Sequence, residues 1–387
     1  MHRILELWFR KIAASAASLL VLFVCEPSVA AQTWTWKTQM IDVSGTMSSL
    51  ALDAFGNLHV SYYFAVDGEL RYAFRPAGGD RWFKSAIDHG YGEFSTRIAV
   101  DAKADPYICY SPGTLKFASF HAGRWTVQPI DPGGGLVSYT CSVQVGRDGI
   151  PQVLWYVESG VFLRYARLKD GVWEAQTADQ DSKPGKWNSM VLNSKGLPRL
   201  SYVTIFKWEL RYAEYDGKAW IRRVVDSPAL NPPDISRGMG NSLALDAHDD
   251  PLISYYDTQS LKIARLVNNR WKIEVVDRYS SSGEMAAWKT YRSSLVLDKQ
   301  GNPHIAFVTP SGLEHAWSEG KEWHTQLVVG GAGAITFDSS MVIGTDGRLY
   351  ITYVDPSDHT LKLATGLAMP EAQSAKAVQT DNEKPRN

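Results

Sequence analysis

The chain has little cysteine and no excess of charge of either sign. It contains 3 cysteines in 387 residues, and its 40 lysines and arginines balance 41 aspartates and glutamates, for a formal net charge of -1. Such a balance gives no global field to attract nucleic acid or an anionic membrane surface. Zinc-ligand spacing, an EF-hand loop and a nucleophile elbow are also missing from the sequence. We therefore expect no metal, no cofactor and no nucleic-acid partner, and any electrostatic specificity must be local.

Long apolar runs are missing too, apart from one near the N-terminus. Residues 12–25 are mostly apolar, follow the basic residues Arg10 and Lys11, and precede the small residues at 28–31. This is the layout of a secretory signal peptide. The run is shorter than the ~20 residues that span a bilayer, which disfavours the alternative of a membrane anchor. We predict a signal peptide at 1–31, a secreted or periplasmic location, and no membrane span after cleavage.

Cleavage would leave two cysteines, Cys109 and Cys141, on neighbouring repeats. A disulfide is possible in an exported protein. Other repeats carry small residues at both positions, which favours two buried thiols. The spacing alone does not decide between these alternatives.

What the sequence does contain is one motif, called here the repeat phrase, that occurs seven times. The first copy reads SLALD at 49–53, HVSYY at 59–63, LRYA at 70–73 and W-x5-D at 82–88, and later copies follow every 45 to 53 residues. Gly- and Asn-rich turns separate the β-rich runs. Four short strands in a repeat of this length are typical of a propeller blade. We predict an all-β, seven-bladed β-propeller of four-stranded antiparallel blades over 32–368.

The seventh copy lacks its fourth strand, because the pattern stops after LKLA at 361–364. The missing phrase stands at the other end of the chain, where Trp36 and Asp42 have the fourth-strand spacing. We predict that a strand at about 34–42 completes the last blade, which favours a closed ring over an open solenoid with two ends to cap. The tail at 369–387 is polar and has no aromatic residue, so we expect it to be disordered. We expect a monomer.

The D-x-x-G-N-P-H-I-x-Y, L-K-Y-A and W-x5-D phrases carry a resemblance to a known family. Over residues 33–366 the chain resembles secreted bacterial seven-bladed propellers of the broad sialidase-like (BNR-like) superfamily. True sialidases have six blades, and their S-x-D-x-G-x-x-W Asp-box is absent from this sequence. The resemblance therefore implies a fold and transfers no catalytic residue.

Comparison of the seven copies separates residues that serve the blade from residues that break its pattern. The tryptophans of the fourth-strand phrase are expected to pack between blades, and the Asp53 series to bond its own turn. The Asp88 series is expected to cap the fourth strand, and His59 and His304 occupy a polar position at a strand end. The clearest exception is Arg97, since the other six copies carry serine there. An arginine near the mouth of the central channel suits carboxylate, sulfate or phosphate recognition, although an interblade salt bridge is an equal alternative.

The loops from fourth to first strand and from second to third strand open on the same face of a propeller, where function is usually carried. Aromatic and charged residues of these loops could hold an acidic sugar, by stacking on its ring and pairing with its carboxylate. The predicted ligand-binding residues are Arg97, Lys186, Trp187, Lys207, Trp208, Asp257, Asp355 and His359.

Two classes of function fit this pattern. The first is binding of a carbohydrate, which we expect to be an acidic glycan. Binding of a cell-envelope protein, as an interaction scaffold, is an alternative within this class. The second is an enzyme of the uronate-lyase type, which needs a cation for the carboxylate and a base for the adjacent proton; the candidate catalytic residues are His89, Tyr91, Arg97, Tyr291 and Arg292. A hydrolase would need two nearby carboxylates, and Asp257, Asp355 and Glu284 come from three different blades. Because no catalytic motif is present, binding is favoured.

Overall fold

The computed structural model describes residues 32–90, 95–130, 137–181, 183–227, 239–257, 260–278, 292–309, 311–320, 322–330, 339–355 and 357–369. The predictions of a signal peptide at 1–31 and of a disordered tail after residue 369 lie outside these ranges. Every regular element in them is a β-strand. Within the same ranges, no helix is long and apolar enough to cross a membrane.

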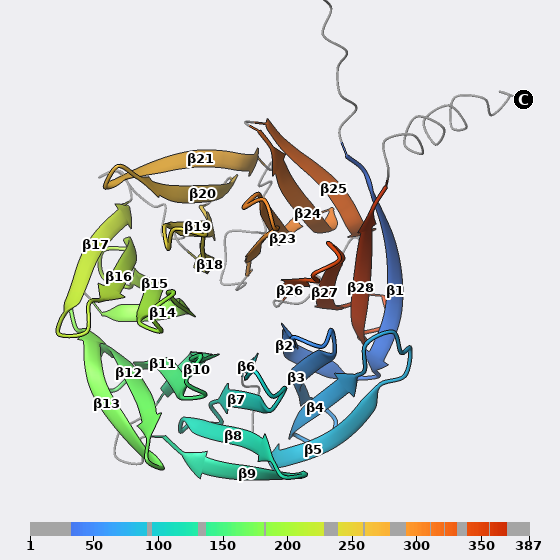
Figure 1. Cartoon of the computed structure of the whole chain (residues 1–387), viewed down its shortest axis with the longest axis horizontal. Helices are drawn as coiled ribbons and strands as arrows, with labels where there is room; N and C mark the ends of the chain where they lie inside the picture. The colour runs from blue at the N-terminus through green and yellow to red at the C-terminus, as the bar shows by residue number, and fades with distance from the viewer. Residues whose placement is uncertain are drawn as a thin grey trace, which may run out of the picture. The chain divides into compact units, whose positions relative to one another are not determined.

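The strands form seven four-stranded antiparallel sheets arranged as blades around a central axis (Figure 1). The first strand of each blade is innermost and the fourth outermost. Blades one to three comprise β2(Gly45–Leu52), β3(Leu58–Phe64), β4(Glu69–Arg75), β5(Phe83–His89); β6(Thr96–Val100), β7(Pro106–Tyr110), β8(Lys116–His121), β9(Arg124–Pro129); and β10(Val137–Val145), β11(Pro151–Val157), β12(Phe162–Lys169), β13(Val172–Asp179). Blades four and five comprise β14(Pro184–Leu192), β15(Pro198–Thr204), β16(Leu210–Tyr215), β17(Trp220–Asp226); and β18(Met239–Leu245), β19(Pro251–Tyr256), β20(Ser260–Val267), β21(Arg270–Arg278). Blades six and seven comprise β22(Ser294–Leu297), β23(Pro303–Thr309), β24(Gly312–Glu319), β25(Glu322–Gly330); and β26(Ser340–Ile343), β27(Leu349–Val354), β28(Leu361–Ala368), β1(Trp34–Asp42). The predicted fold is confirmed.

The ring is closed by pairing the two ends of the chain. Strand β1 lies antiparallel to β28, from Trp34 opposite Ala368 to Asp42 opposite Leu361. Figure 1 shows β1, in blue, along the outer edge of the red seventh blade. The predicted closing strand at about 34–42 is therefore confirmed.

The core lies between adjacent blades, and the second strands carry much of it. All seven residues of β3, β11 and β23 are buried. The fourth-strand tryptophans pack across the junctions, with ring centroids 5.1 Å apart for Tyr72 and Trp125 and 5.5 Å apart for Tyr165 and Trp220. Aromatic pairs at such spacings add stability beyond the area they bury, so the predicted structural role of these tryptophans is confirmed.

The repeated turn between first and second strands is held by its aspartate. The Asp53 carboxylate accepts hydrogen bonds at 2.9 Å from the amides of Phe55 and Asn57. Gly56 adopts a φ of 84°, the left-handed conformation in which an L-residue is strained. The Asp53 series therefore serves the turn, as predicted.

The prediction of two buried thiols is wrong. Cys109 in β7 and Cys141 in β10 form a disulfide between blades two and three, with Cα atoms 6.3 Å apart. The residues at the same positions between other blades explain why the disulfide lies here. At three of the other junctions the equivalent pair is joined by a hydrogen bond between two hydroxyl groups: Ser61 with Thr96 at 2.7 Å, Ser254 with Ser293 at 2.8 Å and Ser48 with Thr352 at 3.0 Å. The disulfide thus replaces an interblade hydrogen bond that the fold uses elsewhere.

Candidate functional site

A ring of serines surrounds the axis at the ends of the innermost strands where the fourth-to-first loops enter. Each serine Oγ accepts a hydrogen bond from a backbone amide of the next blade. The six bonds run from Leu50 to Ser340 (3.0 Å), Ile98 to Ser49 (3.3 Å), Met190 to Ser142 (3.2 Å), Leu243 to Ser189 (3.2 Å), Leu295 to Ser242 (3.1 Å) and Met341 to Ser294 (2.9 Å). The serines therefore serve the fold by joining neighbouring blades.

Arg97 interrupts this ring at β6. A guanidinium has no acceptor, so Arg97 cannot receive the amide of Val143 in the way that serine does in the other blades. Its Nη1 instead donates to the Thr96 carbonyl at 2.7 Å. The fold thus forgoes one of seven equivalent interblade bonds to place a cation at the axis.

The axial cavity contains a second arginine. Its volume is about 250 Å³, and both Arg97 and Arg292 line it, together with the serine ring and the amides of Asn188 and Asn241. The described part of its lining includes no carboxylate. Two guanidinium groups among hydroxyls and amides create a positive site suited to an anionic group.

An aromatic cluster lies on blade four, on the same face. Trp187 in β14 and Trp208 in the loop after β15 have ring centroids 6.4 Å apart. Both adopt positive φ, 47° and 52°, at positions where other blades carry Gly240 and Gly68 with φ of 60° and 66°. The left-handed conformation costs an L-residue roughly 1–2 kcal/mol. Blade one carries Met47 with a φ of 50° at the first position, and blade three carries Val161 with a φ of 61° at the second, so the repeat uses this conformation with several residue types.

The loop before Trp208 adds an exposed ring and cationic groups. Phe206 is 68% exposed, and the Lys183 ammonium lies 4.4 Å from its ring centroid. The Lys207 ammonium lies 3.9 Å from Asp181. Lys186 lies in β14 beside Trp187. The structure therefore brings Lys207, Trp187 and Trp208 together on one blade.

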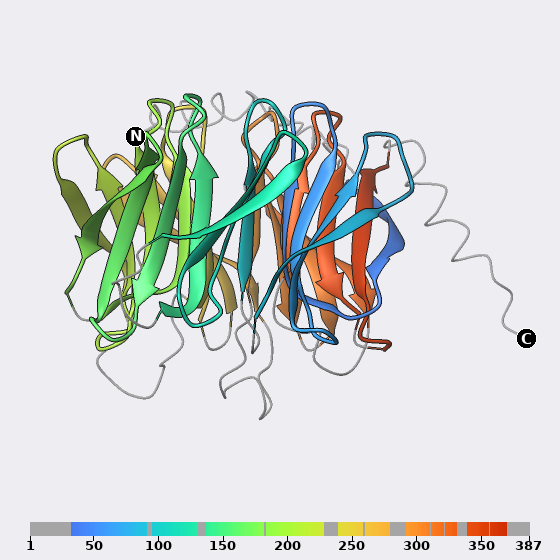
Figure 2. The same cartoon turned by 90° about the horizontal axis from the view of Figure 1, so that it is seen from below.

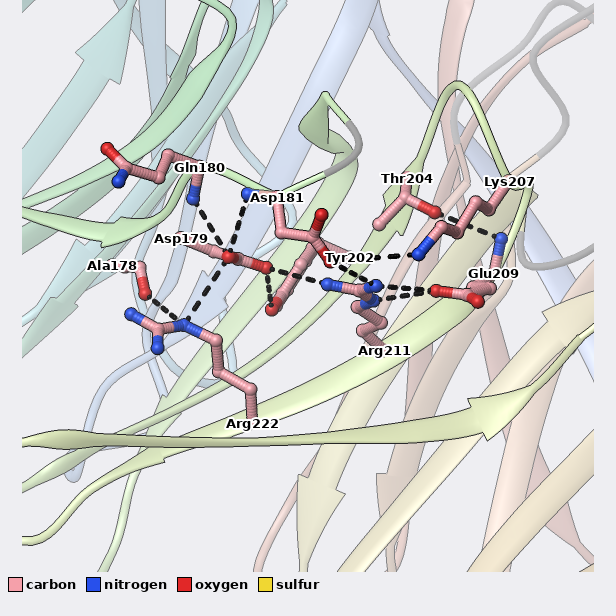
Figure 3. Close-up of polar contacts among 10 residues, drawn as sticks. All are labelled: Ala178, Asp179, Gln180, Asp181, Tyr202, Thr204, Lys207, Glu209, Arg211 and Arg222. Carbon is pink, nitrogen blue, oxygen red and sulfur yellow. Dashed lines mark hydrogen bonds and ion pairs between the residues drawn. The ribbon is translucent and has the colours of Figure 1, made fainter.

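Lys207 stands at the edge of an ion-pair network at the junction of blades three and four (Figure 3). The buried Arg211 guanidinium donates to Asp179 at 3.3 Å, Asp181 at 2.8 Å and Glu209 at 2.7 Å. Burial opposes the charge of Arg211, but its bonds to Asp181 and Glu209 raise its pKa overall. This side chain stays charged and ties the two blades together at the loop face.

The same unit recurs around the ring. The aspartate that ends a fourth strand accepts a hydrogen bond from a tyrosine of the next blade. The four pairs are Asp42 with Tyr62 (2.7 Å), Asp88 with Tyr110 (2.5 Å), Asp179 with Tyr202 (2.7 Å) and Asp226 with Tyr255 (2.8 Å). The predicted capping is also present, as in the His89 amide bonded to Asp88 at 2.9 Å. This series links blades as well as ending strands.

The junction of blades five and six breaks this unit in a way that the sequence comparison had missed. At Asp277 the next blade offers Phe307 in place of the tyrosine and Glu314 in place of the basic residue, equivalent to Arg211. Burial raises the pKa of both Asp277 and Glu314, and the charge of Asp277 adds to the effect on Glu314. The signal was present in the third-strand phrase, where Glu314 stands against Lys or Arg in the other copies.

Two of the predicted ligand-binding carboxylates are paired within their own blades. Asp257 lies 2.6 Å from the Lys262 ammonium, and Asp355 lies 2.8 Å from that of Lys362. Burial opposes ionisation of Asp355, but the bonds from Lys362 and Ser357 lower its pKa overall. His359 is exposed, at the positive-φ position of its turn. A ligand that reaches either carboxylate would therefore also contact the lysine paired with it.

The remaining predicted residues are less well placed for chemistry at the axis. His89 ends the outermost strand β5; its side chain is 76% exposed and lies 3.7 Å from Glu69. The structure does not bring it to the axial cavity lined by Arg97 and Arg292. Tyr91, Tyr291 and Glu284 lie outside the described residues.

Neither a protein-family model nor a curated protein matches the chain. Solved propellers match in fold. The BP39L lectin from Burkholderia pseudomallei has a TM-score of 0.60 at 14% identity, over 84% of this chain and 96% of its own. The polysaccharide lyase Uly1 has a TM-score of 0.53 at 10% identity, over 83% and 90%. AofleA from Arthrobotrys oligospora has a TM-score of 0.52 at 15% identity, over 77% and 91%. At these identities the similarity establishes the propeller fold.

Proposed function

We propose that this chain is an exported carbohydrate-binding propeller that takes an acidic glycan on its loop face, with the acidic group in the axial cavity between Arg97 and Arg292. The observation that carries the proposal is Arg97 itself. It stands where six blades place a serine bonded to the next blade, and it lines a cavity with a second arginine. A residue that gives up a repeated structural bond for a charge is explained by a ligand of opposite charge.

The size of the cavity indicates what enters it. Its volume of about 250 Å³ is just below the ~300–1,000 Å³ of typical small-molecule pockets. It suits one carboxylate or sulfate with its nearest atoms, while the rest of the glycan lies over the loop face. Trp187, Trp208 and the exposed Phe206 supply aromatic surface for a sugar ring on that face.

Two observations support export. The N-terminal sequence has the layout of a signal peptide, and the disulfide between Cys109 and Cys141 is of the kind that persists in oxidising compartments. The fold similarity to the BP39L lectin, although distant, fits a carbohydrate ligand.

Titration calorimetry with oligogalacturonate, against a neutral oligosaccharide of equal length, tests the proposal. Arg97→Ser gives β6 the residue of the other six blades, which can accept the Val143 amide as serine does there, so the fold is retained. We expect its affinity for the acidic ligand to fall at least tenfold, while Arg97→Lys loses less because the charge remains. Equal affinity of the wild-type protein and Arg97→Ser would contradict the proposal.

The same samples test the alternative of a uronate lyase. Elimination removes the proton next to the carboxylate and expels the glycosidic oxygen, leaving an unsaturated uronate that absorbs in the ultraviolet. Wild-type protein is expected to bind without forming this product. Product formation that Arg97→Ser abolishes would replace binding by catalysis and direct the search for the base to His89, Tyr91 and Tyr291.

A further inference from the structure

A larger cavity lies between blades six and seven, on the opposite face. Its volume is about 780 Å³, within the range of small-molecule sites. The turn between β22 and β23 and the turn between β26 and β27 form two of its sides, and the ends of β1 and β28 form the third. Because these turns lie at the far ends of the first strands from the serine ring, this cavity is separate from the axial one.

The neighbouring turns are joined at other junctions. Gln152 of blade three donates to the Gly196 carbonyl of blade four at 3.1 Å, and Ser194 of blade four bonds Asp249 of blade five at 2.9 and 2.6 Å. Between blades six and seven the turns instead line the cavity. Gly344 stands where blade six carries Asp298, and the Asp346 carboxylate fills the place that a side chain at Gly344 would take.

His304 lines this cavity, and its Nε2 lies farther from the turn aspartate than Nε2 of the equivalent His59 does in blade one. His304 Nδ1 lies 3.0 Å from Nε2 of His315, while its own Nε2 lies 3.8 Å from Asp298. In blade one the equivalent His59 is held on both sides, by Tyr72 at 2.7 Å and Asp53 at 3.1 Å. Burial lowers the pKa of both His304 and His315, which favours the neutral form of each ring. The His304 side chain lines the cavity and is 6% exposed, with Asp298 beside its Nε2.

The lining of this cavity carries two carboxylates and one lysine, whereas the lining of the axial cavity carries two arginines and no carboxylate among the described residues. Asp298 and Asp346 line it with one lysine, the exposed Lys299. The side chain of Asp298 is 20% exposed and that of Asp346 is 53% exposed. Arg348 lies 3.5 Å from Asp346 and offsets part of its charge. Because burial favours the neutral form of both histidine rings, the walls favour a positively charged group.

We propose that this second cavity binds a hydroxylated cation of the amino-sugar class. The amine lies near Asp298 and Asp346, and the hydroxyls bond Asn302, Thr345 and Nε2 of His304. The apolar side chains of Leu297, Ile343 and Leu367 line the same cavity and receive the carbon face of the ring. An anionic glycan, which the axial cavity attracts, is repelled here.

Asp298→Asn tests this assignment with little risk to the fold. Blade four carries Asn193 at the same position, where it accepts the turn amides of Lys195 at 3.1 Å and Leu197 at 2.8 Å. Asp53→Asn in blade one is the matched control. The probe is the disaccharide of glucosamine, compared with its N-acetylated form, in titration calorimetry of the mature protein.

We expect the amine to bind at least tenfold more tightly than the N-acetylated sugar, and Asp298→Asn to abolish that preference while Asp53→Asn keeps it. His304→Gln, which copies Gln152 of blade three, is expected to weaken binding of both sugars. Absence of binding, or equal preference in Asp298→Asn and wild-type protein, would overturn the assignment. Arg97→Ser is expected to leave this binding unchanged, so the two cavities are tested independently.

Discussion

At the scale of single residues, seven copies of one blade provide the reference that shows which side chains depart from it. Serine at the axis bonds the next blade, and Arg97 cannot. Aspartate at the end of a fourth strand bonds a tyrosine, and Asp277 meets Phe307 and Glu314 instead. The first departure places charge in a cavity and suits a ligand. The second places two carboxyl groups together, with consequences for stability.

The Asp277–Glu314 junction predicts a pH effect. Both carboxyl groups have raised pKa values in the folded state, with burial as the largest cause. Their contribution to stability is therefore fully present below their unfolded pKa values, near 4, and is lost as the pH rises through the raised folded values. We expect wild-type protein to lose stability over that interval relative to Glu314→Gln, measured by urea unfolding at a series of pH values. Parallel curves for the two proteins would show that Glu314 does not titrate as described.

Restoring the repeat at this junction should stabilise the protein. The double variant Phe307→Tyr with Glu314→Lys supplies the phenol and the cation that Asp88 receives from Tyr110 and Lys116. We expect a gain of about 1.5–3 kcal/mol at neutral pH, typical of a hydrogen bond to a charged group. Unchanged or lower stability in thermal unfolding would mean that the blades cannot approach closely enough here.

At the scale of elements, the disulfide between β7 and β10 occupies the place of a hydroxyl pair. The sequence separation of its cysteines is 32, and a cross-link of this kind typically adds about 2–4 kcal/mol. We expect the variant with Ser at both Cys109 and Cys141 to lose about this much. Its free energy of unfolding should nevertheless exceed that of the variant with Ala at both positions by about 1 kcal/mol, because two serines can form the hydrogen bond seen between Ser254 and Ser293. Equal unfolding midpoints for the two variants would show that the serine pair does not form.

At the scale of the whole molecule, closure by β1 joins the two ends of the chain. Figure 2 shows the blades standing side by side around the ring. Strand β1 covers β28, and Asp42 at its end bonds Tyr62 and Lys84 of blade one at 2.7 and 3.1 Å. Removing residues 32–42 would expose the edge of β28 and break the junction of blades seven and one.

We expect a protein that begins at residue 43 to unfold at lower temperature and to aggregate, and a synthetic peptide of residues 32–43 to restore part of its stability. Calorimetry with and without the peptide makes the comparison, and a peptide with Trp36 and Asp42 changed to Ala is the control. Stability equal to that of the longer chain would show that closure contributes little.

The sequence by itself determined the blade number, the strand order and the closing strand, because each blade repeats the same local pattern of buried strand residues and turn residues. It also singled out Arg97, since a break in a repeat is visible without coordinates. Tertiary structure decided what depends on contacts between blades. The partners of Cys109, the carboxyl pair at Asp277 and the cavity beside His304 lie at junctions between segments tens of residues apart in the chain. Their properties follow from distance and burial, which sequence spacing does not encode.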